Sequence, residues 1–135
     1  IIKQVAGEKP ETKSSNIYYK ESNTSTRGPH HDTFSTKFKS FIYLTDVDSL
    51  SYGPYSYVEG SHNPSYVKEG ITSVVNKIRG RPKTDSLFRQ RQEKSANKIT
   101  AKKGALIISN QTGVHFGYPQ EEGYKRMLVT NHHQF

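Results

Sequence analysis

The sequence of 135 residues contains no cysteine, no tryptophan and a single methionine. Without cysteine the chain has no disulfide scaffold, no thiol nucleophile and no cysteine-based zinc or iron–sulfur site. No apolar run approaches the roughly 20 residues that cross a bilayer as a helix. A signal-peptide or transit-peptide pattern is also absent. We therefore expect no membrane partner and a cytoplasmic location, in a reducing compartment that suits a cysteine-free chain.

Apolar residues are scarce, at 31% of the chain, and nine tyrosines and six phenylalanines supply much of the area that a core could bury. A chain of this length holds one domain. Because it starts at Ile1 without a methionine, we interpret it as a fragment or a trimmed product. The low apolar content fits that interpretation, since a partner or a missing segment would then complete the core.

The net charge of +8 comes from one internal segment. Residues 64–103 carry eleven basic and three acidic residues, whereas residues 1–63 and 104–135 are each neutral overall. A uniformly basic protein would suggest non-specific binding of polyanions. A single basic segment between two neutral ones predicts a local positive patch instead.

Short strands separated by glycine and proline turns dominate the pattern. Residues 7–29 are polar and predict a loop, and residues 65–95 predict short helices and loop interrupted by Gly70, Gly80 and Pro82. Such a pattern indicates a mainly β sandwich or barrel with one helical insertion. Strands are expected at residues 37–47, 55–59, 104–109 and 125–131.

A candidate metal site begins at His30-His31-Asp32. In an extended segment, side chains alternate between faces, so His30 and Asp32 would point the same way and His31 the opposite way. A second histidine, His115, lies just after the apolar stretch that Gly104 opens. Two histidines and one carboxylate on a β scaffold are the ligands of non-haem Fe(II) oxygenases. Zinc is the competing metal, and spacing alone does not separate the two.

Three motifs in the same order resemble the phytanoyl-CoA dioxygenase-like family of Fe(II)/2-oxoglutarate-dependent oxygenases. The first is His30-His31-Asp32, and the second is the stretch FIYLTDVDSLSYGPYSYVEGSHN at residues 41–63. The third is GALIISNQTGVHFG, which contains His115 and is followed by Arg126. The resemblance covers residues 28–63 and 100–130.

The resemblance implies a double-stranded β-helix (jelly-roll) core with a short helical or irregular insertion. Residues 1–135 would then be a single oxygenase catalytic core that lacks N-terminal elements of the family. Residues 1–27 would be a polar lead and residues 64–103 a basic insertion. Members of the family are about twice as long as this chain.

The resemblance also implies the roles of individual residues. His30, Asp32 and His115 would bind Fe(II), and Arg126 would bind the distal carboxylate of the co-substrate 2-oxoglutarate, a task suited to the planar guanidinium. Lys39 and Phe41, on the strand expected at 37–47, would line the co-substrate pocket. A surface ion pair of Arg126 and a solvent-seeking Lys39 are the alternatives that the residues alone leave open.

The activity implied by the resemblance is hydroxylation of a small metabolite with O₂, releasing succinate and CO₂. The partners would be this small molecule and O₂, not nucleic acid. The basic segment would form a partly mobile lid that favours an anionic substrate. Its lid residues would be Lys77, Arg79, Arg81 and Lys83.

One alternative belongs to a different class of protein. The basic segment 64–103 contains Tyr66 and Phe88, so the chain could be a non-catalytic β domain that binds nucleic acid or another polyanion by counterion release. That hypothesis leaves the two histidines, the carboxylate and Arg126 unexplained. Fe(II)-dependent formation of succinate would support the enzyme, and salt-sensitive retention of DNA or RNA would support the binding domain.

Overall fold

A computed structural model describes residues 1, 3–4, 7, 9–35, 37–80 and 82–134, with some helical side chains left undescribed. The strands are β1 (Glu11–Glu21), β2 (Phe38–Tyr43), β3 (Tyr55–Tyr57), β4 (Asn97–Ile99), β5 (Leu106–Asn110), β6 (His115–Gly117) and β7 (Lys125–Gln134). The helices are the short η1 (Leu50–Tyr52), α2 (Pro64–Ile78) and α3 (Pro82–Ser95).

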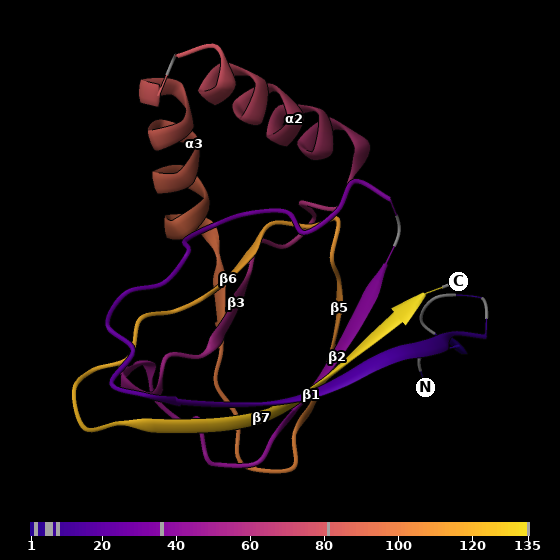
Figure 1. Ribbon diagram of the computed structural model, residues 1–135, viewed down its shortest axis with the longest axis vertical. Coiled ribbons are helices and arrows are strands. Elements are labelled where there is room, and N and C mark those ends of the chain that lie inside the picture. Colours follow the sequence, from indigo (N-terminus) through magenta and orange to yellow (C-terminus); the bar gives the residue numbers. More distant parts are fainter. Residues whose placement is uncertain (2, 5–6, 8, 36, 81, 135) are drawn as a thin grey trace.

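Two antiparallel sheets form the β core (Figure 1). The first sheet has the strand order β1-β7-β2-β5, and the second has the order β4-β3-β6. β6 is an edge strand of the second sheet, paired with β3 on one side. On its other side, His30 forms an isolated antiparallel bridge with His115 of β6. Because the chain passes back and forth between the two sheets, the fold is the double-stranded β-helix that the family resemblance implied.

The space between the sheets is filled by alternate residues of the strands. On β7, Arg126, Leu128 and Thr130 are buried, whereas the residues between them are partly exposed. Tyr43 of β2 is fully buried and joins the two sheets through its hydroxyl group. This hydroxyl donates to the carbonyl of Ile99 and accepts from the backbone N–H of Tyr55, each at 3.0 Å.

The prediction of a loop over residues 7–29 is wrong for Glu11–Glu21, which form β1. All eleven residues of β1 are exposed, so the strand lacks the apolar alternation by which strands are identified in a sequence. Its pairing with β7 runs from Glu11 opposite Gln134 to Glu21 opposite Lys125. Backbone pairing with β7, and not burial of apolar side chains, therefore stabilises this strand.

Residues 65–95 form a helical hairpin that is more regular than the predicted short helices and loop. Gly80 and Pro82 separate α2 from α3, as expected, but Gly70 lies inside α2 and does not end it. The two helices extend from one end of the sheets, with the end of α2 and the start of α3 farthest from them (Figure 1). In the part of the chain that the structure describes, no helix is long and apolar enough to span a membrane.

Candidate metal centre

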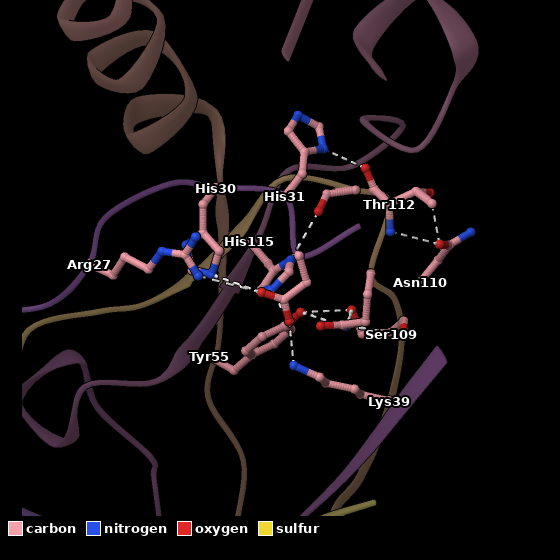
Figure 2. Close-up of polar contacts among 12 residues, drawn as sticks. Arg27, His30, His31, Lys39, Tyr55, Ser109, Asn110, Thr112 and His115 are labelled. Atoms are coloured by element: carbon pink, nitrogen blue, oxygen red, sulfur yellow. Dashed lines mark hydrogen bonds and ion pairs between the residues drawn. The ribbon is translucent and has the colours of Figure 1, made fainter. Parts of the chain in front are cut away.

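His30 and His115 lie together at the end of the sheets nearest the helical hairpin (Figure 2), and Asp32 converges with them. One potential ligand atom from each residue lies within 4.8 Å of the other two. Nε2 of His30 is 3.4 Å from one Asp32 carboxylate oxygen, and Nε2 of His115 is 3.5 Å from the other. The three side chains that the motif and its spacing selected therefore face a common point.

Backbone hydrogen bonds hold the two histidines in this arrangement. The N–H of each residue donates to the carbonyl of the other, at 3.1 Å from His30 and 3.0 Å from His115. Their Nδ1 atoms are occupied as well: that of His30 bonds the Gly28 carbonyl at 2.7 Å, and that of His115 bonds the Gly113 carbonyl at 2.9 Å. A carbonyl only accepts, so Nδ1 carries a proton, and Nε2 is the ring atom left to bind a metal ion or to bond Asp32.

This donor set fits a divalent metal ion. Two imidazole lone pairs and a carboxylate that face one another repel unless a cation or a proton lies between them. Tying the outer ring nitrogen to a carbonyl is the usual way in which proteins orient metal-binding histidines. His115 is buried and the Asp32 side chain is one-quarter exposed, so the site is reachable from one side.

Positive groups surround the carboxylate of Asp32. Hydrogen bonds from the side chains of His115 and His30, followed by one from the ammonium of Lys39, hold the pKa of Asp32 far below its usual range, despite its partial burial. Lys39 reaches across from β2 to contact the carboxylate directly. The guanidinium of Arg27 lies 3.7 Å away on the other side, from a side chain that is 69% exposed. Asp32 is thus ionised and available as an anionic ligand.

A cavity of about 200 Å³ opens between the sheets beside the centre. Arg126 and Lys39 supply positive charge to its wall, and Gly117 of β6 leaves room next to Arg126. Phe41, which the sequence placed with Lys39, also lines it. The full lining consists of Tyr18, Lys20, Lys39, Phe41, Tyr55, Gly117, Arg126, Leu128, Thr130 and His132.

Arg126 is a buried cation without a carboxylate partner among the described residues. Burial lowers the pKa of its guanidinium, opposed only by the nearby Tyr43. Its Nε is buried and finds no hydrogen-bond acceptor in the described part of the chain. A buried arginine left in this condition is costly, and a bound carboxylate would relieve the cost. The alternative of a surface ion pair for Arg126 does not hold in this structure.

A buried polar cluster that the sequence analysis missed lies beside the centre. The hydroxyl of Tyr55 is 2.7 Å from that of Ser109, and the side-chain amide of Gln111 donates to the Ser109 hydroxyl at 3.1 Å. Burial raises the pKa of the Tyr55 hydroxyl, which therefore stays protonated. The Tyr55 ring also packs against His115, with ring centroids 5.8 Å apart.

These missed residues gave no usable signal in the sequence. In the sequence, Arg27 ends the polar segment of residues 1–27, and Tyr55 resembles an ordinary core residue. Ser109 and His132 reach the site because both stand directly opposite Lys39 on neighbouring strands. That register is a property of the sheet, and no spacing in the chain encodes it.

Of the four proposed lid residues, two are described in full at the end of α2. Lys77 and Arg79 are exposed near the end of α2, the side chain of Lys83 is not described, and Arg81 lies outside the described residues. The end of α2 is the part of that helix farthest from the sheets (Figure 1). Their role as a lid stays a prediction.

Comparison by sequence finds no relative. No known protein family matches the chain, and no curated protein is similar in sequence. The specific resemblance to phytanoyl-CoA dioxygenases is therefore not confirmed by these comparisons.

Comparison by structure finds many similar proteins. SnoK, a non-heme alpha ketoglutarate dependent carbocyclase from nogalamycin biosynthesis, has 23% identity and a TM-score of 0.71, over 97% of this chain and 52% of its own. AviO1 from Streptomyces viridochromogenes Tue57 has 16% identity and a TM-score of 0.71, over 98% and 54%. HygX from Streptomyces hygroscopicus, solved with nickel and 2-oxoglutarate bound, has 16% identity and a TM-score of 0.70, over 98% and 58%.

These similarities establish the fold and its extent. The chain spans slightly more than half the length of each of these three solved proteins. Nearly all of the chain, including β1 and the helical hairpin, lies within the matched region. The architecture is thus shared with proteins described as non-heme, 2-oxoglutarate-dependent enzymes, at an identity that shows common fold only.

Proposed function

We propose that this chain is the catalytic core of an Fe(II)/2-oxoglutarate-dependent oxygenase that hydroxylates a small anionic metabolite. The observation that carries the proposal is the convergence of His30, Asp32 and His115 with both Nδ1 atoms tied to backbone carbonyls. Two histidines and one carboxylate would hold the iron and leave coordination positions for other ligands, as expected of non-haem iron sites. A structural neighbour, HygX, was solved with nickel and 2-oxoglutarate bound.

The neighbouring cavity supports 2-oxoglutarate as the co-substrate. Arg126 would bind the distal carboxylate with its planar guanidinium, because the group is buried, positively charged and lacks an acidic partner among the described residues. Lys39 would face the end of the co-substrate nearest the metal, since it contacts Asp32 and lines the same cavity. Phe41 and Leu128 supply apolar wall between the two ends.

The chain's own groups would prepare the site for an oxidation. Iron bound by the three residues would supply the ability to activate O₂, and 2-oxoglutarate would be oxidised to succinate and CO₂. The carbonyls of Gly28 and Gly113 fix the two imidazoles, and Lys39 and Arg27 neutralise part of the Asp32 charge. The Tyr55 hydroxyl stays a neutral hydrogen-bonding group near the centre.

Hydroxylation of an anionic substrate is the finer part of the proposal. The carboxylate ligand Asp32 is present, whereas related halogenases replace this ligand with a small residue to admit halide. Arg27 beside Asp32, together with the net charge of +8 carried by residues 64–103, would favour anions. Neighbours described as a carbocyclase and an epimerase make the reaction outcome the point to be measured.

The experiment has a binding arm and an activity arm. Calorimetric titration should show one Ni²⁺ site per chain, lost in His30→Ala and Asp32→Ala and retained in the exposed control variant Thr72→Ala. With Fe(II), O₂ and 2-oxoglutarate, the chain should release succinate. In a screen of anionic metabolites, the rate of succinate release should rise when the metabolite is a substrate. A product heavier by one oxygen atom would identify hydroxylation. Ni²⁺ binding that survives both ligand variants would refute the proposed centre.

A further inference from the structure

His31 lies between two proposed ligands in the sequence but points away from the metal centre (Figure 2). Its Nδ1 donates to the carbonyl of Thr112 at 2.5 Å, and its ring packs against Phe34 with centroids 5.4 Å apart. Its Nε2 is buried and has no hydrogen-bond partner among the residues that the structure describes. The ring is therefore held on one side by a strong bond and on the other by packing.

The packing partner is the backbone of α2 at Gly70. A Cβ placed on Gly70 would lie 2.3 Å from Nε2 of His31 and 2.6 Å from its Cδ2, closer than any real contact. Gly70 is buried within α2, and its backbone has no positive φ that would require glycine. Glycine inside a helix costs about 1 kcal/mol relative to alanine. The close approach of the His31 ring is thus the structural reason for glycine here.

The second helix of the hairpin touches the same loop. Nη1 of Arg89, on α3, donates to the carbonyl of Arg27 at 3.3 Å and lies beside Gly28. The helices also pack against each other. The hairpin therefore contacts the loop that carries His30 and Asp32 from both sides, at Arg27 and at His31.

We propose that His31 is a positioning residue that transmits the position of α2 to the metal-binding loop. Its ring fills the space between Gly70 and Thr112, so a shift of the helix displaces the ring, and a displaced ring moves the neighbouring His30 and Asp32. This inference rests on the proposed function, since it concerns the ligands of that metal centre. The hairpin would then set the geometry of the centre as well as cover it.

A mutant cycle tests the contact between His31 and Gly70. Gly70→Ala inserts a methyl group where the ring lies and should weaken Ni²⁺ binding about tenfold, within the range seen when groups that orient metal ligands are changed. His31→Asn keeps a donor near the position of Nδ1 but leaves space at Gly70, and should weaken Ni²⁺ binding by only about threefold. The double variant should bind like His31→Asn alone.

Two further measurements separate positioning from simple helix packing. The d–d absorption spectrum of the Co²⁺-saturated protein should change in Gly70→Ala, because the ligand geometry changes even at full occupancy. In the double variant, the Co²⁺ spectrum should match the spectrum of His31→Asn. Thr72→Ala, on the exposed side of the same helix, is the matched control and should leave both the affinity and the spectrum unchanged.

The outcomes are distinguishable from failure of the proposed function. If His30→Ala leaves Ni²⁺ binding intact, the metal centre itself is wrong. If His30→Ala abolishes binding but Gly70→Ala changes neither affinity nor spectrum, only the positioning role is overturned. Should Gly70→Ala fail to fold, the double variant decides. A double variant that also fails to fold, or that binds Ni²⁺ about tenfold more weakly than His31→Asn, shows that Gly70 is needed for another reason and overturns the proposal.

Discussion

Lys39 contacts the same Asp32 carboxylate oxygen that faces Nε2 of His115. The ammonium group thus occupies one side of a proposed metal ligand and, at the same time, lines the cavity that contains Arg126. A cation in this position has opposite effects on the binding of the metal ion and on the binding of 2-oxoglutarate. It repels a divalent metal and competes for the carboxylate, and it attracts the dianion of 2-oxoglutarate.

Replacing Lys39 should therefore separate metal binding from co-substrate binding. We expect Lys39→Met to strengthen Ni²⁺ binding and to weaken 2-oxoglutarate binding to the Ni²⁺-loaded protein, each by about three- to tenfold. Titration calorimetry with each ligand in turn measures both. Lys37→Met, which removes an exposed charge from the same segment, is the control. A parallel loss of both affinities would instead mean that Lys39 has only a structural role.

Arg126 should be required for its shape as well as its charge. Arg126→Lys keeps a cation but loses the paired donors of the guanidinium, so 2-oxoglutarate should bind about 10- to 100-fold more weakly, while Ni²⁺ binding stays unchanged. The neighbouring exposed residue provides the control Lys125→Ala, which should bind 2-oxoglutarate normally. An unaltered 2-oxoglutarate affinity in Arg126→Lys would remove Arg126 from the co-substrate site.

The basic turn of the hairpin should act by long-range attraction. Changing Lys77, Arg79, Arg81 and Lys83 together to glutamine should raise the apparent Michaelis constant for an anionic substrate by up to about tenfold at low salt. The effect should shrink at physiological salt, where the Debye length is about 8 Å. Steady-state assays at two ionic strengths measure it. The charge-matched control changes Lys3, Lys9, Lys13 and Lys125, and an equal effect from this set would contradict a local patch.

Tyr43 should matter for the stability of the double-stranded core. Tyr43→Phe leaves the ring but removes a hydroxyl that bonds Ile99 of β4 and Tyr55 of β3. The Tyr55 N–H loses this partner in a buried position and the Ile99 carbonyl loses it in a partly buried one, so the free energy of unfolding should fall by about 1–3 kcal/mol in urea titrations. The control Tyr19→Phe removes an exposed hydroxyl that bonds Glu21. It should change the free energy of unfolding by less than about 0.5 kcal/mol. Equal effects of the two variants would show that the inter-sheet bonds contribute little.

Local patterns in the sequence determined a large part of this protein. The strands at Phe38–Tyr43 and Leu106–Asn110 follow from runs of aromatic and β-branched residues, and the break between the helices follows from Gly80 and Pro82. The spacing of His30 and Asp32 predicted which two side chains of the motif would point together. The place of His115, just after an apolar strand, made it the candidate for the second histidine, and the resemblance to a known family implied the same residue.

Only the tertiary structure decided the remainder, because it depends on which strands become neighbours. The exposed strand β1 exists through its pairing with β7, and its own residues carry no apolar alternation. Ser109 and His132 meet Lys39 through the register of three strands. The contact of Gly70 with His31 joins positions 39 residues apart, and it depends on a ring and a helix backbone that no local pattern brings together.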